Sequence, residues 1–245
     1  MKAKGVYENN IKDGIGKILF DNGDIYVGDL YKGKQQGKGK YTFSSPKDVY
    51  EGDFENNKFH GTGTYFMSYN STYEGQFSKG KCCGYGKFKS ISLKHTGMWN
   101  NNQANGDGIL EKNGNVIKCN FINGYANGYG TINYNNGDYY EGNIKNNLKY
   151  GNGVLITKSG KSVGNFDDIH FNGTKYYTNS NKYEGNLIND LRDGLGTLYF
   201  SDGRKYSGNF SNNKIKGFGT YTTCDGIQYE GTWLGLQNCQ ELKPL

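Results

Sequence analysis

A tandem repeat with a period of about 23 residues runs along the chain and limits what the chain can fold into. One copy opens with Tyr50-Glu51-Gly52-Asp53-Phe54 and closes with Gly61-Thr62-Gly63-Thr64-Tyr65. The predicted units start near residues 3, 26, 50, 73, 95, 117, 140, 162, 183 and 206, with a terminal strand at 229. A fixed period of this size is typical of a linear array, in which each unit contacts mainly its neighbours. We therefore predict one array over residues 3–245, whose function lies on an extended surface.

The residue pattern within each unit predicts two strands. The first position is usually aromatic, the third is glycine and the fifth is large and apolar, so these side chains share one strand face. Polar residues follow as a turn, and a second strand carries glycine at the twelfth and fourteenth positions and an apolar residue at the sixteenth. Asn-Gly and Asp-Gly pairs such as Asn22-Gly23 end many units and predict two-residue hairpin turns. The predicted fold is all-β: an elongated, single-layer array of antiparallel β-hairpins in a twisted sheet.

Three glycines in each unit need an explanation, because glycine weakens a strand by roughly 0.5–1 kcal/mol relative to alanine. We expect the bare backbone at all three positions to be covered by aromatic rings from the first, fifth and sixteenth positions. Such cover would let a single layer bury apolar area. A valine at Gly63 should then displace a ring, whereas a turn substitution such as Asn57→Ser should be nearly neutral.

Composition argues against several classes of site. The five cysteines are odd in number and form no Cys-x-x-Cys pair, which disfavours a disulfide framework or a zinc site and favours a reducing compartment. His60, His95 and His170 lie in different units, with no nucleophile and orienting acid beside them. A net charge of +6 is small for a nucleic-acid binder. We expect a cytoplasmic, non-enzymatic protein without metal, cofactor or nucleic acid.

One stretch has a clear positive bias. No Asp or Glu occurs between Glu74 and Asp107, where five lysines form a candidate basic patch: Lys79, Lys81, Lys87, Lys89 and Lys94. They belong either to a solvated strand face between acidic neighbours or to a surface that binds anionic lipid, where each lysine contributes about 1 kcal/mol.

The repeat itself resembles the MORN repeat, named for membrane occupation and recognition nexus. The pattern is Tyr-x-Gly-x-aromatic, about six polar residues, then Gly-x-Gly-x-aromatic, and residues 59–65 and 137–142 follow it closely. The resemblance covers essentially the whole chain, but the units over about 95–182 diverge. His95 and Ser162 replace the opening tyrosine, Cys119 replaces a glycine and Lys175 replaces the second paired glycine of its unit.

The resemblance implies a shallow groove lined by aromatic rings, which takes an amphipathic helix or an extended peptide of a partner protein. It also implies a scaffold in cytoskeletal or ciliary assemblies, such as radial-spoke heads, or a protein peripheral to a membrane. The predicted groove residues are Tyr26, Tyr50, Phe54, Tyr65, Tyr73, Phe77, Phe88, Trp99, Tyr140, Tyr183, Tyr206, Phe210, Tyr221, Tyr229 and Trp233.

Three alternatives to a simple scaffold remain open at this point. The chain could be a membrane adaptor that uses the basic patch, or a regulatory module of a separately encoded enzyme. It could also form a homodimer through its C-terminal end. Lys2 and Lys4 guard the first strand edge against strand addition, whereas the strand at 229–233 has no lysine until Lys243.

Overall fold

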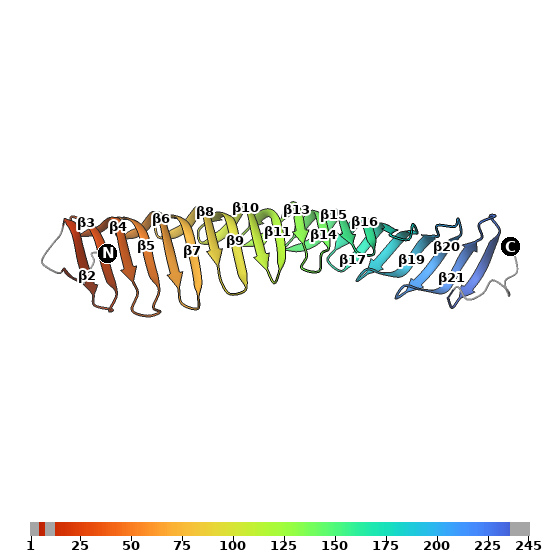
Figure 1. Ribbon diagram of the computed structural model, residues 1–245, viewed down its shortest axis with the longest axis horizontal. Helices are drawn as coiled ribbons and strands as arrows, with labels where there is room; N and C mark the ends of the chain where they lie inside the picture. Colours follow the sequence, from red (N-terminus) through yellow and green to blue (C-terminus); the bar gives the residue numbers. More distant parts are fainter. Residues whose placement is uncertain (1–4, 8–12, 236–245) are drawn as a thin grey trace. The chain divides into compact units, whose positions relative to one another are not determined.

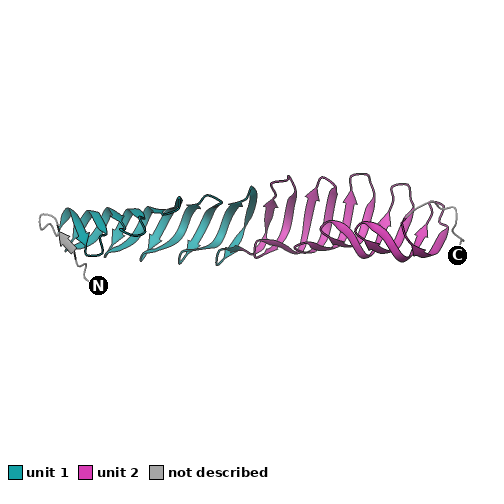
Figure 2. Cartoon of the chain, turned by 90° about the horizontal axis from the view of Figure 1, so that it is seen from below, with its two compact units in different colours: residues 1–125 teal, residues 126–245 magenta. Residues whose placement is uncertain are grey.

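The computed structural model describes residues 5–7 and 13–235, and every element in them is a β-strand (Figure 1). The prediction of an all-β hairpin array is confirmed. The chain divides into two compact units, residues 1–125 and 126–245 (Figure 2). The predicted extent of the array, 3–245, remains a prediction, since its ends and Lys2, Lys4 and Lys243 lie outside the described residues.

The strands follow one another closely in each unit. Those of the first are β1 (Gly5–Tyr7), β2 (Gly14–Phe20), β3 (Ile25–Tyr31), β4 (Lys34–Thr42), β5 (Val49–Glu55), β6 (Lys58–Met67), β7 (Ser71–Ser78), β8 (Lys81–Lys89), β9 (Leu93–Asn100), β10 (Gln103–Lys112) and β11 (Asn115–Ile122). The short β12 (Tyr125–Ala126) lies at the boundary. Those of the second are β13 (Gly128–Asn133), β14 (Tyr139–Lys145), β15 (Leu148–Thr157), β16 (Gly160–Asp167), β17 (His170–Tyr177), β18 (Lys182–Ile188), β19 (Leu191–Tyr199), β20 (Lys205–Ser211), β21 (Lys214–Thr222) and β22 (Gln228–Trp233).

Within each unit every strand pairs antiparallel with its neighbours in the chain, which makes a meander (Figure 1). The register sets Tyr50 opposite both Tyr41 and Tyr65, so the first and sixteenth positions of consecutive strands share one face. We call this the inner face. In the first unit it carries Tyr26, Leu30, Tyr41, Tyr50, Phe54, Tyr65, Tyr73, Phe77 and Phe88. The opposite side, which carries the second and fifteenth positions, is the outer face.

The core of the repeat is a tyrosine ring lying over two glycines. Tyr50 is fully buried, and a Cβ added at Gly63 would lie 2.5 Å from its hydroxyl oxygen. A Cβ at Gly52 would lie 2.6 Å from the same atom. The hydroxyl donates a hydrogen bond to the main-chain oxygen of Asp53 at 2.9 Å. Burial raises the pKa of this phenol above its usual value, so the group stays a neutral donor. The ring cover predicted for the third and fourteenth glycines is thus observed, but the nearest ring is that of the first-position tyrosine and not one from the fifth or sixteenth position.

The twelfth glycine has a different cause, and the prediction that it too is covered by a ring is wrong. Gly61 has a φ of +53°, and its absent Cβ would lie 2.6 Å from the Asp53 carboxylate rather than near a ring. The register shifts here, so that a bulge interrupts the ladder between β5 and β6. A left-handed residue in a bulge favours glycine because it has no Cβ to clash.

Most of the two-residue turns predicted at the unit ends are three-residue loops. At Asn22-Gly23 only the glycine has a positive φ, and the amide of Phe20 donates to Asp24 across a three-residue loop. A loop of this length uses a single left-handed residue. Of the unit-end pairs, Asn113-Gly114 does form the predicted two-residue turn. Most of the other two-residue turns in the described residues lie inside the units, as at Asn56 and Asn57, where both φ values are positive.

The two-residue turns inside the units also join consecutive hairpins. Asn57 Oδ1 accepts a hydrogen bond from the amide of Gln35 at 2.8 Å, and its own amide donates to the oxygen of Gln35 at 3.1 Å. Asn102 repeats this arrangement with Cys82 in the first unit, and Asn213 repeats it with Arg192 in the second. Each of these turns therefore forms two hydrogen bonds with the start of a strand in the preceding hairpin.

These hydrogen bonds of Asn57 contradict the expectation that Asn57→Ser is neutral. Two other substitutions at Asn57 test the turn more sharply. Asn57→Ala should lower the free energy of unfolding by about 1–2 kcal/mol. Alanine has no side-chain oxygen to accept the hydrogen bond from Gln35. It also keeps the Cβ that disfavours the left-handed φ of 64° at this position. Asn57→Gly keeps the turn and loses the acceptor alone, so it should cost about 1 kcal/mol less than alanine. Urea unfolding of both variants measures the difference; equal losses would show that backbone strain plays no part.

Candidate functional site

Most of the predicted groove residues form the core of the repeats. Buried side chains make up eleven of the fifteen: Tyr26, Tyr50, Phe54, Tyr73, Phe77, Tyr140, Tyr183, Tyr206, Phe210, Tyr221 and Trp233. They pack edge to face, as Tyr50 does with Phe54 at 5.2 Å between ring centroids. These rings have little surface left for a partner, because the single layer uses them as its own interior. Their role in binding stays a prediction.

Accessible aromatic surface lies instead on the half-buried rings of the inner face. Tyr65, Phe88, Trp99 and Tyr229 complete the predicted set, and each is half-buried. In the first unit, Phe43, which the sequence patterns did not single out, packs 5.9 Å from Tyr65. Further half-buried residues continue the same surface: Phe20, Tyr41, Phe59 and Met67.

Buried aspartates hold two of these tyrosines in place. Asp48 Oδ2 accepts a hydrogen bond from the Tyr65 hydroxyl at 2.8 Å, and its Oδ1 accepts from the Ser68 amide at 2.7 Å. Asp24 holds Tyr41 in the same way, at 2.7 Å. Burial alone would raise the pKa of Asp48, but the hydrogen bonds from Ser68 and Tyr65 lower it. The tyrosine rings are therefore fixed in orientation before any partner arrives.

The outer face carries exposed apolar side chains that the sequence analysis missed. They occupy the thirteenth position, between two glycines, and are Ile15, Tyr85, Tyr129, Leu195 and Phe218. Tyr85 is 52% exposed, and Phe218 is 57% exposed. Their spacing is readable in the sequence as Gly-x-Gly with a large central residue, but strand alternation alone could not say that this side of the sheet is uncovered.

The five candidate lysines are all exposed, but they do not gather in one place. Lys79 lies in the turn before β8, and Lys81 begins that strand, where its Nζ donates to Asn101 at 3.2 Å. Lys87 and Lys89 lie at the other end of β8, and Lys94 pairs with Glu111 at 2.9 Å. Eight residues of strand span about 26 Å, so the two groups are well separated.

His95 takes the place of the opening tyrosine in its unit. It is buried, with its ring edge to face against Trp99 at 5.2 Å and Phe121 at 4.7 Å. Neither ring nitrogen has a hydrogen-bond partner among the described residues. Burial lowers its pKa to about 4, so the ring is neutral in the folded protein near pH 7. His95 is thus a structural substitute for tyrosine that lacks the hydroxyl donor.

The unit that starts at Ser162 departs furthest from the repeat. Gly164 lies opposite Gly173 and no bulge follows, so Gly173 fills the place of the fourteenth glycine. Lys175 therefore sits where other units have the sixteenth, apolar residue, opposite both Ser162 and Tyr183. The prediction that Lys175 replaces a glycine is wrong, because the missing bulge shortens the strand.

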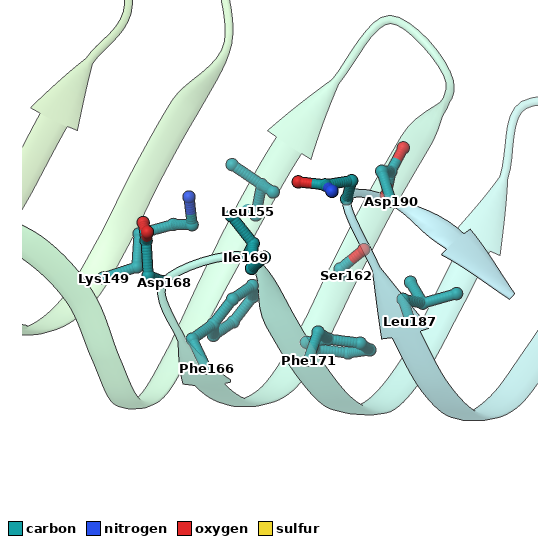
Figure 3. Close-up of a pocket in the computed structure, with 10 residues that line it drawn as sticks. Lys149, Leu155, Ser162, Phe166, Asp168, Ile169, Phe171, Leu187 and Asp190 are labelled. Atoms are coloured by element: carbon teal, nitrogen blue, oxygen red, sulfur yellow. The ribbon is translucent and has the colours of Figure 1, made fainter. Parts of the chain in front are cut away.

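A cavity of about 270 Å³ opens beside Ser162 (Figure 3). Its lining is Lys149, Leu155, Ser162, Phe166, Asp168, Ile169, Phe171, Leu187, Asn189 and Asp190. Lys175 is buried next to this region and forms an ion pair with Asp190. Burial lowers the pKa of Lys149, whose Nζ donates to the Tyr134 hydroxyl at 3.4 Å.

Two further observations concern the described residues only. They contain no group of three His, Cys, Asp or Glu side chains placed to hold a metal ion. They also contain no long apolar helix of the kind that spans a bilayer.

Comparisons with solved structures find weak likenesses in chain path. A mutant of the TCP10 domain of Danio rerio CPAP is 11% identical with a TM-score of 0.33, over 89% of this chain and 99% of that one. The SAS-4 (dCPAP) TCP domain of Drosophila melanogaster, in complex with a proline-rich motif of Ana2 (dSTIL), is 12% identical with a TM-score of 0.24, over 94% and 90%. Neither likeness bears on function. No curated protein matches the chain significantly.

A family model gives a much stronger result. The MORN repeat matches eight segments of the chain, namely residues 4–25, 26–45, 50–69, 73–92, 120–139, 140–162, 183–203 and 206–228. The segments around His95 and Lys175, where the structure departs from the tyrosine-over-glycine pattern, are not among them. MORN repeats form non-enzymatic modules for binding proteins or membranes. With most of its length matched in register, this chain belongs to the MORN repeat family.

Proposed function

We propose that the protein is a non-enzymatic scaffold that binds a partner protein along the inner face of its first unit. The observation that supports it is the run of half-buried rings on that face, including Tyr41, Tyr65 and Phe88. Contiguous apolar surface left uncovered by a protein's own layers is typical of an interaction site. An amphipathic helix or an extended peptide is the partner that suits such a row of rings.

Rigidity supports the same proposal. Aromatic rings have few rotatable bonds, and here hydrogen bonds to Asp24 and Asp48 already fix two of them. Binding to rings that are ordered in advance costs less conformational entropy than binding to flexible side chains. A cytoskeletal or ciliary assembly is the setting that we propose for this scaffold.

Lipid binding is the weaker alternative. Four of the five candidate lysines lie at or beside the two ends of β8 instead of forming one patch, and Lys94, on β9, is paired with Glu111. A divided charge attracts an anionic surface less than a compact cluster does.

Partner capture by matched variants tests the scaffold proposal. The double variant Phe43→Ser and Phe88→Ser should weaken capture of a partner from native cells by at least about tenfold, because both lost rings belong to the inner face. Tyr85→Ser, on the outer face of the same strand as Phe88, should leave capture unchanged. Circular dichroism checks that all variants fold.

The outcomes separate the alternatives. Equal capture by the folded inner-face variant would contradict the proposal. Flotation with vesicles of anionic lipid that is lost on replacing Lys87 and Lys89 would favour the membrane adaptor. A captured enzyme whose activity changes with the chain would favour a regulatory module. Light scattering that gives a dimer, lost on deleting 229–245, would establish the homodimer predicted from the C-terminal strand.

A further inference from the structure

The cavity beside Ser162 lies next to the place where the other units put a tyrosine ring, since Ser162 lines it but Gly164 and Gly173 do not. In six units the hydroxyl of the opening tyrosine lies 2.5–2.8 Å from the position of a Cβ on the third glycine: Gly28, Gly52, Gly75, Gly142, Gly185 and Gly208. At Gly164, the equivalent glycine here, the three nearest atoms all belong to the main chain. Serine is too short to reach this space, so the repeat keeps the glycine and lacks the ring.

The surroundings of a tyrosine are largely retained. In the regular units the fifth-position ring contacts the opening tyrosine of its own unit edge to face, as Phe210 contacts Tyr206 at 5.3 Å between centroids. Phe166 occupies that fifth position here and is buried, with Tyr140 of the preceding repeat at 5.2 Å. Phe171 occupies part of the missing ring's place, since a Cβ at Gly173 would lie 2.9 Å from Cζ of its ring. The cavity of about 270 Å³ remains open beside Phe171 and Ser162.

Apolar and charged side chains line different parts of the cavity. Figure 3 shows Phe166 and Phe171 together on one side of the cavity, with Lys149 beside Asp168 and with Asp190 apart from them. Because Asp190 is also paired with Lys175, the nearby charges are balanced by one carboxylate for each lysine. The site thus offers an apolar floor and carboxylate acceptors, with no excess positive charge to attract an anion.

We propose that this cavity binds a neutral phenol ring beside Ser162. Size permits it, since a cavity of about 150 Å³ holds benzene in other proteins and this one measures about 270 Å³. The ring lies against Phe166 and Phe171, and the hydroxyl donates to a carboxylate at the rim. The phenol comes either from a tyrosine side chain of a partner protein or from a free small molecule. This site is independent of the inner face of the first unit, so its failure would leave the proposed scaffold function intact.

Fluorine NMR on the full chain tests the proposal with 4-fluorophenol as the probe. The wild-type chain should shift or broaden the probe signal saturably, whereas 4-fluorobenzoate, which is anionic, should bind at least about tenfold more weakly. Ser162→Tyr should fill the cavity with the repeat's own ring and weaken probe binding by at least about tenfold. Ser162→Ala keeps the space open and should bind as the wild type does.

A second variant guards against a failure to fold. If circular dichroism shows that Ser162→Tyr is unfolded, Leu155→Trp narrows the cavity from its half-buried wall and should give the same loss. Competition by N-acetyltyrosinamide would assign the site to a protein side chain, and its absence would assign it to a free phenol. No saturable shift with the wild type, or equal binding by a folded variant with a filled cavity, would overturn the proposal.

Discussion

Gly63→Val should lower the free energy of unfolding by about 2–3 kcal/mol, because the new side chain would occupy the space of the Tyr50 ring. A Cβ at Gly63 would lie 2.5 Å from the tyrosine hydroxyl oxygen and 2.6 Å from the ring carbon that bears it. The ring is fully buried and stacked on Phe59 at 3.8 Å, so it cannot move aside without disturbing its neighbours. A displaced Tyr50 ring would also lose the hydrogen bond from its hydroxyl to the main-chain oxygen of Asp53.

The matched control is Gly231→Val. Gly231 holds the third position of the last strand, but nothing lies within 4 Å of the site of its Cβ. Valine suits a strand better than glycine does, so the change should be within about 0.5 kcal/mol of zero or slightly stabilising. Urea unfolding, followed by circular dichroism, compares the two variants with the wild type. Equal stabilities for both would mean that ring packing is not the reason for the glycine.

His95→Tyr should remove a pH dependence of stability from the chain. The pKa of His95 is about 4 in the folded protein and about 6.5 when unfolded, so the unfolded state binds more protons between these values. Stability from this residue is therefore present above about pH 6.5 and falls as the pH drops towards 4, by about 2–3 kcal/mol. Tyrosine does not titrate in this range, and its hydroxyl would donate to a main-chain oxygen as that of Tyr50 does, whereas neither ring nitrogen of His95 has a partner among the described residues.

Urea unfolding at pH 7 and at pH 4.5 measures this effect. The wild type should lose more stability between the two pH values than the variant does, by about 2 kcal/mol. Carboxylates such as Asp24 and Asp48 contribute acid sensitivity to both proteins alike, so the difference isolates residue 95. Parallel losses in the two proteins would contradict the burial of an uncharged, unpaired imidazole.

Much of the fold can be predicted because the same residue pattern recurs in most of the repeats. Alternation around Tyr50, Gly52 and Phe54 predicts the strand and its inner face, and the pairing of Gly52 with Gly63 confirms why glycine recurs there. A single copy would not carry this argument. Repetition in register makes a weak local pattern into a strong one.

The errors have physical causes that a position count cannot show. The bulge at Gly61 makes one strand locally longer than its partner, and its absence near Gly173 shifts Lys175 by two places. The depth of burial is harder to predict. The sequence pattern places Tyr50 and Phe54 in a groove open to a partner, yet Tyr50 covers the glycines and packs against Phe54, and both rings are buried. The cavity beside Ser162 arises from an absent ring, and the sequence shows only a substitution there.

Photo-crosslinking from the two faces of one strand tests the scaffold account most directly. Phe88 and Tyr85 both lie on β8, the first half-buried on the inner face and the second exposed on the outer face. A photoreactive p-benzoylphenylalanine at each position, activated in native cells, reports which face a partner touches. The account predicts a discrete protein adduct from position 88, lost in the presence of Phe43→Ser, and none of the same mass from position 85. An adduct from position 85 alone, or equal adducts from both, would contradict it.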